Sequence, residues 1–260
     1  MELLRASRIL FTTHLWRTAF SRRGLVGALL AAVPVVVALI GARVQANHHM
    51  HKPPPVLDVL WFGLIQVFVP LVSLIFGAAV VAEEIEDRTA SFLFTRPIPR
   101  PAILLGRWLA AYLVVVALLC ASARAVIMIL GSLSGEFTLP PGFDASVLAT
   151  VALGAAAYTA VFAALGTLLK HPVIVGLGYT FAVEGFLANL PGSNQALTIQ
   201  FYLRSFLAGA DPSIGEHFSF FADPNLVTSG AAFLRLAWIL VAALVLGSWT
   251  IARKQYVLPA

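Results

Sequence analysis

Residues 103–130 read ILLGRWLAAYLVVVALLCASARAVIMIL and contain only two charged side chains, Arg107 and Arg124. About 20 consecutive, mostly apolar residues are enough for an α-helix to cross the hydrocarbon core of a bilayer. The stretch is longer than this minimum. It therefore predicts a transmembrane helix that tilts in the membrane or protrudes from it.

The composition of the whole chain indicates a membrane protein. Of its 260 residues, 60% are hydrophobic and 11% are charged, and the mean hydropathy is +0.90. A soluble domain carries roughly a quarter charged residues. A cytosolic enzyme, a disordered chain and a secreted disulfide scaffold are therefore poor fits. The single cysteine, Cys120, cannot form an internal disulfide.

Six segments of the chain are long enough and apolar enough to cross a membrane. They are residues 24–44, 57–82, 103–130, 145–169, 172–190 and 231–252. Together they predict an all-α membrane protein with six transmembrane helices in a single transmembrane domain over residues 1–260. Pro34 and Pro70 lie inside two of these segments. Membrane helices tolerate proline where neighbouring groups satisfy the freed carbonyl oxygen.

A row of small residues marks one face of the segment at residues 145–169. Alanine recurs at every fourth residue, at Ala152, Ala156, Ala160 and Ala164. Small side chains allow two membrane helices to approach closely. We expect this face to be buried against another helix of the same chain.

The distribution of lysine and arginine predicts the orientation in the membrane. Twelve of these residues fall at the two termini, between the second and third spans, and at Lys170, whereas four fall on the other side. Basic residues are enriched in cytoplasmic loops, so both termini are assigned to the cytoplasm. The net charge of +5 is then mainly a topology signal, and no nucleic-acid partner is expected.

Two segments outside the predicted spans have helical patterns. Residues 1–22 place apolar and basic side chains on opposite sides, which predicts an amphipathic helix on the inner membrane surface, with a frayed tail as the alternative. The segment 191–230 is assigned to the outside of the cell, with an interfacial helix over 196–207. The apolar side of the first segment consists of Leu3, Leu4, Leu10, Phe11 and Leu15, and its opposite side includes Arg5, Arg8 and Thr12.

The loop between the second and third spans is the most informative part of the sequence. Residues 82–108 read AEEIEDRTASFLFTRPIPRPAILLGRW, so acidic residues end a span, an apolar trio follows, and a proline-rich elbow precedes the next span. The prolines prevent one continuous helix. An apolar patch flanked by charges is typical of a docking surface for a cytoplasmic protein, and a solvated loop is the alternative reading.

This loop resembles the signature loop of ATP-binding cassette (ABC) type-2 transporter permeases. Glu84, Glu86 and Thr89 match the acidic and threonine positions of the family pattern, residues 95–100 match its elbow, and residues 106–107 match its Gly-Lys pair. Arg88 stands where the family often has glycine. The resemblance covers about 25 residues, and the six-span layout with a cytoplasmic N-terminus extends it over the chain.

The resemblance implies a fold and a mode of action. The fold is an exporter-like type V transmembrane domain in a bacterial cytoplasmic (inner) membrane. The N-terminal helix and the coupling loop, residues 83–101, dock on a separate ABC ATPase subunit, whose ATP-driven closure rocks the membrane halves. The residues implied in this coupling are Glu83, Glu84, Glu86, Asp87, Arg88, Thr89, Phe92, Leu93, Arg96, Pro97 and Arg100.

The chain has no ATPase motif of its own. A phosphate-binding loop needs Gly-Lys followed by Ser or Thr, whereas Lys52, Lys170 and Lys254 are followed by Pro, His and Gln. We therefore expect no cofactor on this chain, with ATP and Mg on two copies of a partner ATPase. A second permease copy is also expected, with a homodimer favoured over a heterodimer.

Two ionisable residues inside the spans, Arg124 and Glu184, are candidate pathway residues. Such residues usually face protein or water and have partners. The two could lie at similar depth and pair with each other, either along a polar pathway or as a structural ion pair. His48, His49 and His51, in the first outer loop, are a weaker candidate for a copper or zinc site.

Three classes of function are compatible with these features. The first is the membrane subunit of an ATP-driven exporter. The second is a membrane-anchored assembly or regulatory partner of an ATPase, for example in signal transmission or copper-enzyme maturation, which moves no free substrate. The third is an intramembrane enzyme, for which Arg124 and Glu184 alone are a weak constellation.

Overall fold

The computed structural model describes residues 15–48, 56–86, 100–131, 141–187, 193–210 and 225–253. Over these ranges the chain is almost entirely helical and contains no β-strand. The helices are α2 (Arg22–His48), α3 (Val56–Asp58), η1 (Val59–Phe68), α4 (Val69–Glu86), α6 (Arg100–Gly131), α7 (Phe143–Leu168), α8 (Pro172–Gly178), η2 (Tyr179–Phe186), η4 (Ser193–Leu197), α9 (Ile199–Ala210) and α11 (Ser229–Arg253).

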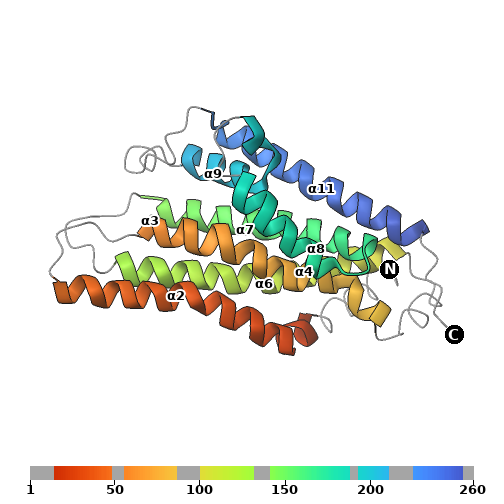
Figure 1. Cartoon of the computed structure of the whole chain (residues 1–260), viewed down its shortest axis with the longest axis horizontal. Helices are drawn as coiled ribbons and strands as arrows, with labels where there is room; N and C mark the ends of the chain where they lie inside the picture. The colour runs from red at the N-terminus through yellow and green to blue at the C-terminus, as the bar shows by residue number, and fades with distance from the viewer. Residues whose placement is uncertain are drawn as a thin grey trace.

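The long helices lie side by side along the longest axis of the molecule (Figure 1). The first residue of α2 and the last residue of α11 lie at the same end of this bundle, which we call the terminal end. Helices α7 and α11 begin at the other end, which we call the opposite end. The sequence predicts that the terminal end faces the cytoplasm.

Within the ranges that the structure describes, five helices have the length and composition needed to cross a membrane. They are Arg22–Val44, Val59–Val80, Ile103–Gly131, Phe143–Leu168 and Ser229–Arg253.

The sixth predicted span, residues 172–190, is described only to residue 187. Helix α8 has 7 residues and η2 has 8, which at 1.5 Å per residue covers about 22 Å. The hydrocarbon core is about 30 Å thick. The described part of this segment is therefore too short to cross a membrane as a continuous straight helix. Within the described residues, the six-span prediction is matched by five long helices and one shorter apolar segment.

Helix α7 forms the centre of the bundle. In the most hydrophobic 18-residue stretch of α7, 72% of the residues are buried. The corresponding share is 28% in α2 and 22% in α11. Glycine allows α4 to approach α7 closely, because a Cβ atom on Gly77 would lie 2.8 Å from the Thr159 carbonyl oxygen. Glycine has the same role on α7, where a Cβ on Gly166 would lie 2.9 Å from the Ala78 carbonyl oxygen.

The alanine row on α7 is buried within the chain, as the sequence predicts. Ala156, Ala160 and Ala164 are buried, and the last two pack against Ala243 of α11. Ala152, the first alanine of the row, is half-buried. The small side chains therefore bring α7 and α11 of one chain together.

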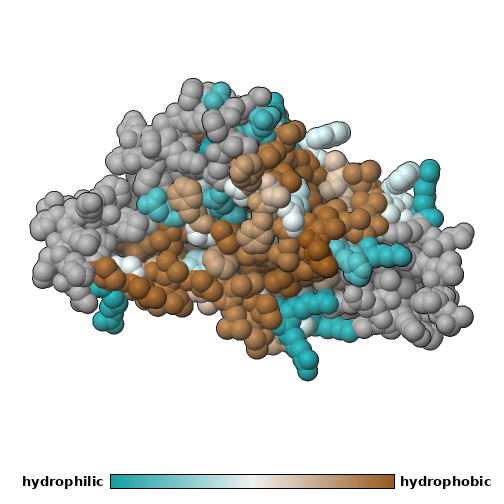
Figure 2. All heavy atoms as spheres, in the orientation of Figure 1, coloured by the Kyte–Doolittle hydropathy of each residue, from teal (hydrophilic) through white to brown (hydrophobic). Residues whose placement is uncertain are grey.

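The outer helices present an apolar surface. Figure 2 shows a broad hydrophobic area over the helices, and most of the strongly hydrophilic side chains that project from it lie toward the ends. Large apolar residues such as Leu29, Ile174 and Trp238 are exposed on different helices. In a bilayer this surface faces lipid, so its exposure agrees with a multi-pass membrane protein.

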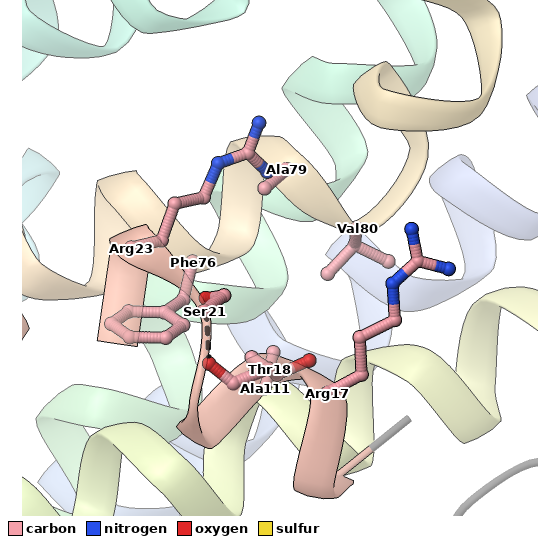
Figure 3. A pocket seen from close by; sticks show the side chains of 8 residues that line it. All are labelled: Arg17, Thr18, Ser21, Arg23, Phe76, Ala79, Val80 and Ala111. Atoms are coloured by element: carbon pink, nitrogen blue, oxygen red, sulfur yellow. Dashed lines mark hydrogen bonds between the residues drawn. The ribbon is translucent and has the colours of Figure 1, made fainter. Parts of the chain in front are cut away.

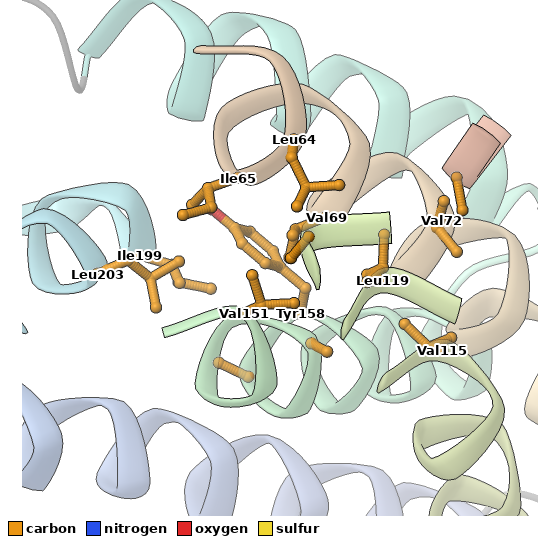
Figure 4. Close-up of a cluster of buried hydrophobic side chains, with 14 of the residues drawn as sticks. Leu64, Ile65, Val69, Val72, Val115, Leu119, Val151, Tyr158, Ile199 and Leu203 are labelled. Atoms are coloured by element: carbon orange, nitrogen blue, oxygen red, sulfur yellow. The ribbon is translucent and has the colours of Figure 1, made fainter. Parts of the chain in front are cut away.

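Helix α9 differs from the sequence expectation of an interfacial helix over residues 196–207. Ile199, Leu203 and Leu207 are at most 2% exposed, and α9 packs against α7 and α11. Figure 4 shows Ile199 and Leu203 in the same apolar cluster as Tyr158. Because α9 is amphipathic, its pattern resembles that of a surface helix, but its apolar side meets protein.

Candidate functional site

The candidate site begins at a proline in the second membrane-spanning segment. Pro70 has no backbone N–H, so it cannot donate a hydrogen bond to the carbonyl four residues earlier. The helix before it is a π-helix, in which the Val69 N–H donates to the Leu64 carbonyl five residues earlier. This combination leaves the carbonyl oxygens of Ile65 and Gln66 without their usual helical donors.

A side chain from α9 supplies the missing donor. The Gln200 Nε2 group donates to the Ile65 carbonyl oxygen at 3.2 Å and to the Gln66 carbonyl oxygen at 3.3 Å. Gln200 is 2% exposed, and an unsatisfied buried carbonyl costs about 1–3 kcal/mol. The interaction therefore attaches α9 to the break between η1 and α4.

A buried carboxylate holds the start of α9 from its other side. Glu184 of η2 is 1% exposed and accepts hydrogen bonds from the backbone N–H groups of Ile199 and Gln200, both at 3.0 Å. These are the first two residues of α9, whose N–H groups have no partner within the helix. A negative charge at this position also interacts favourably with the helix dipole.

Two tyrosines complete the surroundings of Glu184. The Tyr179 hydroxyl donates to Glu184 Oε1 at 2.6 Å. Tyr158 interacts electrostatically with Glu184, but among the described residues its buried hydroxyl makes no hydrogen bond of standard geometry. Figure 4 shows the Tyr158 side chain reaching from α7 toward Ile65. We call Tyr158, Tyr179, Glu184 and Gln200 the Glu184 cluster.

Further polar contacts hold α9 in place. Arg204 is 3% exposed and donates to Gln195 Oε1 at 2.6 Å. The Tyr202 hydroxyl donates to the Ala196 carbonyl oxygen at 2.6 Å and accepts from Arg235 of α11 at 3.2 Å. Side chains thus link α9 to η4 and α11, in addition to η1 and η2.

The pairing predicted for Arg124 and Glu184 is wrong. Arg124 forms an ion pair with Asp144 at the start of α7, and the two side chains are 52% and 38% exposed. Glu184 is buried and bonded to α9 instead. Arg124 lies near the last turns of α6, at the end of the bundle where α7 begins, so its side chain reaches Asp144 there. Glu184 lies instead among apolar helices.

Sequence reasoning identified Glu184 but missed Gln200, Tyr179 and Arg204. Pro70 was the available signal for Gln200, because a proline inside a membrane helix requires a donor from elsewhere. The chain separates the two residues widely, so the sequence could not identify which side chain supplies that donor.

The chemistry of the cluster is that of a structural connection. It holds one carboxylate, two phenols and one amide, and the parts of the chain that the structure describes contain no group of three metal-ligating side chains. Its hydrogen bonds join η1, η2 and α9 within an apolar part of the bundle.

The residues predicted to couple to an ATPase lie mostly outside the described ranges. Helix α4 runs past the end of its apolar span at Val80 and continues to Glu86, so the backbone of Glu83, Glu84 and Glu86 is helical. Arg100 is the first residue of α6. The predicted coupling residues outside the described ranges are Asp87, Arg88, Thr89, Phe92, Leu93, Arg96 and Pro97.

Two further predictions also fall largely outside the described ranges. Residues 1–14 of the predicted amphipathic helix are not among the described residues. His48 is the last residue of α2, whereas His49 and His51 lie beyond it and outside the description. The histidine metal site therefore stays a sequence prediction.

The long apolar helices and the lipid-facing surface define a multi-pass helical membrane protein. The sequence profile of the ABC-2 family transporter proteins matches residues 9–247. The chain therefore belongs to this family and is the membrane component, or permease, of an ABC transporter that works with an ABC ATPase subunit. A comparison with curated proteins finds no match to this chain.

Proposed function

We propose that the chain is the permease subunit of an ATP-driven exporter and couples ATP hydrolysis by a separate ATPase subunit to substrate movement across a bacterial cytoplasmic membrane. The observation that carries this proposal is the family match over residues 9–247. The absence of a phosphate-binding loop from the sequence supports a separate ATPase. ATP and Mg are bound by that partner, in two copies, and this chain holds no cofactor.

The geometry of α4 supports residues 83–101 as the coupling loop. Helix α4 is 18 residues long, or about 27 Å, and it connects the start of this loop with η1. At its other end it meets the carbonyls of Ile65 and Gln66, which Gln200 binds. A displacement of the loop by the ATPase would shift α4 and so act on the Glu184 cluster and α9.

The same geometry gives Glu184 a positioning role in the proposed cycle. Its carboxylate holds the N-terminus of α9, while α8, which leads into η2, packs beside α4. A transport pathway along this face would open when η2 and α9 separate. A second copy of the chain, in a homodimer with both termini in the cytoplasm, would form the other half of that pathway.

Co-purification tests the proposal. The chain is expressed with its neighbouring genes and solubilised gently, and the preparation is examined for a bound ATPase. We expect an ATPase to be retained by the unaltered protein, and we expect Glu84→Ala and Phe92→Ala to reduce its binding or its stimulation. Glu136→Ala is the matched control and should behave like the unaltered protein, because Glu136 lies between the third and fourth predicted spans, on the outer side of the predicted topology.

The outcomes separate the proposed function from its alternative. Substrate-stimulated ATP hydrolysis and vesicle transport that are lost in Phe92→Ala would support an exporter. A retained, regulated ATPase with no substrate stimulation would support an assembly or regulatory partner. If no ATPase is retained and the three variants are alike, the proposed coupling is wrong.

A further inference from the structure

A pocket at the terminal end lies apart from the Glu184 cluster. It has a volume of about 50 Å³ and lies between the start of α2, the later part of α4 and α6. One side is polar and the other apolar, and the described residues that line it include two arginines and no acid. Figure 3 shows these residues, which are Arg17, Thr18, Ser21, Arg23, Phe76, Ala79, Val80 and Ala111.

A tight turn before α2 builds the polar side of the pocket. The Ser21 hydroxyl donates to the Thr18 carbonyl oxygen at 2.8 Å and accepts from the Gly24 N–H at 3.1 Å, so it caps α2. A Cβ atom on Gly24 would lie 2.0 Å from the Ala19 carbonyl oxygen, so this turn requires glycine. The turn places Arg17 before α2 and Arg23 within it.

The two arginine side chains flank the same part of α4. In Figure 3 the Arg23 guanidinium group reaches toward Ala79 and the Arg17 group toward Val80. Arg107 of α6 donates to the Val80 carbonyl oxygen at 3.2 Å, which brings a third positive charge to this wall. The charged side chains described around this pocket are thus all basic, and its base is apolar and formed in part by Phe76 and Ala111.

The pocket lies at the level where the hydrocarbon core begins. The apolar span of α2 starts at Arg22, and that of the second segment ends at Val80. Trp16 and Phe20, just before α2, stack at 5.3 Å and are 65% and 79% exposed. Exposed aromatic side chains at a span end are typical of the interfacial headgroup region. The arginines of the pocket are thus at headgroup height.

We propose that this pocket binds the phosphate of an anionic phospholipid. Arg17 and Arg23 bind the phosphate oxygens, and the wall formed by Phe76, Ala79 and Val80 receives the glycerol and the first methylene groups. Basic pockets between membrane helices are suited to anionic headgroups. A free phosphate ion shares the headgroup chemistry, but it has no apolar part to occupy the wall, and the membrane level favours a lipid.

The bound lipid would connect the start of α2 with α4. Its phosphate would bridge the arginines of α2 and of the turn before it, while its apolar part would contact the later turns of α4. The proposal does not rest on ATP coupling, so loss of ATPase binding in other variants leaves it intact. It predicts only that this face retains a particular class of lipid.

Native mass spectrometry of the full-length protein tests lipid binding. The protein is purified in detergent and titrated with phosphatidylglycerol or phosphatidylcholine. We expect one phosphatidylglycerol to bind more tightly than phosphatidylcholine, and Arg17→Gln to weaken that binding about fivefold, which corresponds to the ~1 kcal/mol contributed by one basic residue near a lipid surface. Arg17 is exposed, so its replacement should leave folding unchanged.

Arg22→Gln is the matched control. Arg22 is an exposed arginine at the same helix start, but it does not line the pocket, and its replacement should change phosphatidylglycerol binding less than twofold. Thr18→Val is a second pocket variant, which removes a hydroxyl group from the pocket lining and keeps the net charge. It should weaken phosphatidylglycerol binding less than Arg17→Gln does. The proposal would be overturned if Arg17→Gln and Arg22→Gln weakened phosphatidylglycerol binding equally, or if the protein bound phosphatidylglycerol and phosphatidylcholine equally tightly.

Inorganic phosphate separates the two sources of the ligand. Millimolar phosphate should compete only weakly with phosphatidylglycerol, because it lacks the apolar part. If inorganic phosphate alone binds as tightly and Arg17→Gln weakens it equally, the pocket takes a soluble anion and the lipid proposal is wrong.

Discussion

At the scale of single residues, Pro70 and Gln200 form the clearest functional pair in the molecule. The proline leaves two carbonyl oxygens in η1 without helical donors, and the glutamine amide donates to both. The pair lies among apolar side chains, where no water is needed to satisfy the backbone. A break in one helix is thereby converted into an attachment point for another.

A double-mutant cycle tests this pairing. Gln200→Leu should lower the free energy of unfolding by about 2 kcal/mol, because the Ile65 and Gln66 carbonyls lose their donor. In a Pro70→Ala background the same substitution should cost less than half as much, since residue 70 then supplies a backbone N–H. Unfolding in mixed detergent micelles measures both values.

Gln66→Leu is the control for this cycle. It removes a similar side-chain amide but leaves the Gln66 carbonyl and the Gln200 donor in place, so its effect should be within about 0.5 kcal/mol. Equal costs of Gln200→Leu in the two backgrounds would show that Gln200 does not compensate for the proline.

Arg124 and Glu184 are both ionisable residues within predicted spans, but their surroundings differ. The Arg124–Asp144 ion pair is partly exposed at the opposite end of the bundle, where such pairs contribute about 0–1 kcal/mol. Glu184 is buried and held by backbone N–H groups. The Arg124–Asp144 pair joins the ends of α6 and α7, whereas Glu184 joins η2 to α9 inside the bundle.

At the scale of elements, the two short helices η2 and α9 depend on each other. Helix α9 is 12 residues long, and isolated helices of this length are marginally stable in water. Its first two N–H groups are bonded by Glu184, and that of Phe201 by the Thr198 hydroxyl at 3.2 Å. The start of α9 is therefore defined by side chains outside the helix.

Removal of the Glu184 charge should loosen this start. Glu184→Gln places an amide NH2 group against backbone N–H donors and removes a charge-assisted hydrogen bond, so hydrogen exchange of the amides of residues 199–201 should accelerate about tenfold or more. Exchange followed by mass spectrometry measures the effect on the peptide that covers α9.

Asp144→Asn provides the comparison for Glu184→Gln. It also neutralises a carboxylate, but that carboxylate pairs with Arg124 away from α9. We expect it to leave exchange in α9 unchanged. If the two variants have the same small effect, apolar packing rather than the carboxylate holds the start of α9.

At the scale of the whole molecule, the segment from Pro172 to Phe186 determines the topology. Its described helices are together too short for a continuous straight span, but α9, which follows it, is buried against α7 and α11. Irregular backbone is tolerated at membrane depth where protein surrounds it. The segment can therefore cross the membrane together with the elements packed against it.

Cysteine labelling tests the crossing. In a Cys120→Ser background, Asn194→Cys should react with a membrane-impermeant maleimide on intact cells, whereas Lys170→Cys should react only after permeabilisation. Both positions are exposed in the structure. The Cys120→Ser protein alone should remain unlabelled. Labelling of both cysteines from one side would instead show that residues 172–186 enter and leave the same face.

The sequence by itself determined the class of the protein. Long apolar segments must form helices in lipid, because every backbone hydrogen bond has to be made within the segment. That requirement is local, so the spans at residues 24–44, 103–130 and 145–169 agree closely with α2, α6 and α7. The charged, proline-rich loop at residues 83–101 indicated the family, which the match over residues 9–247 confirms.

The tertiary structure alone decided which polar groups meet. Three features depend on how distant segments pack: the donor on α9 for the Ile65 and Gln66 carbonyls, the partner of Arg124 at the start of α7, and the burial of α9. Hydropathy measures how apolar a segment is, and this does not distinguish a helix that faces lipid from one that faces protein. Contacts between segments far apart in sequence follow from the packing of the whole bundle.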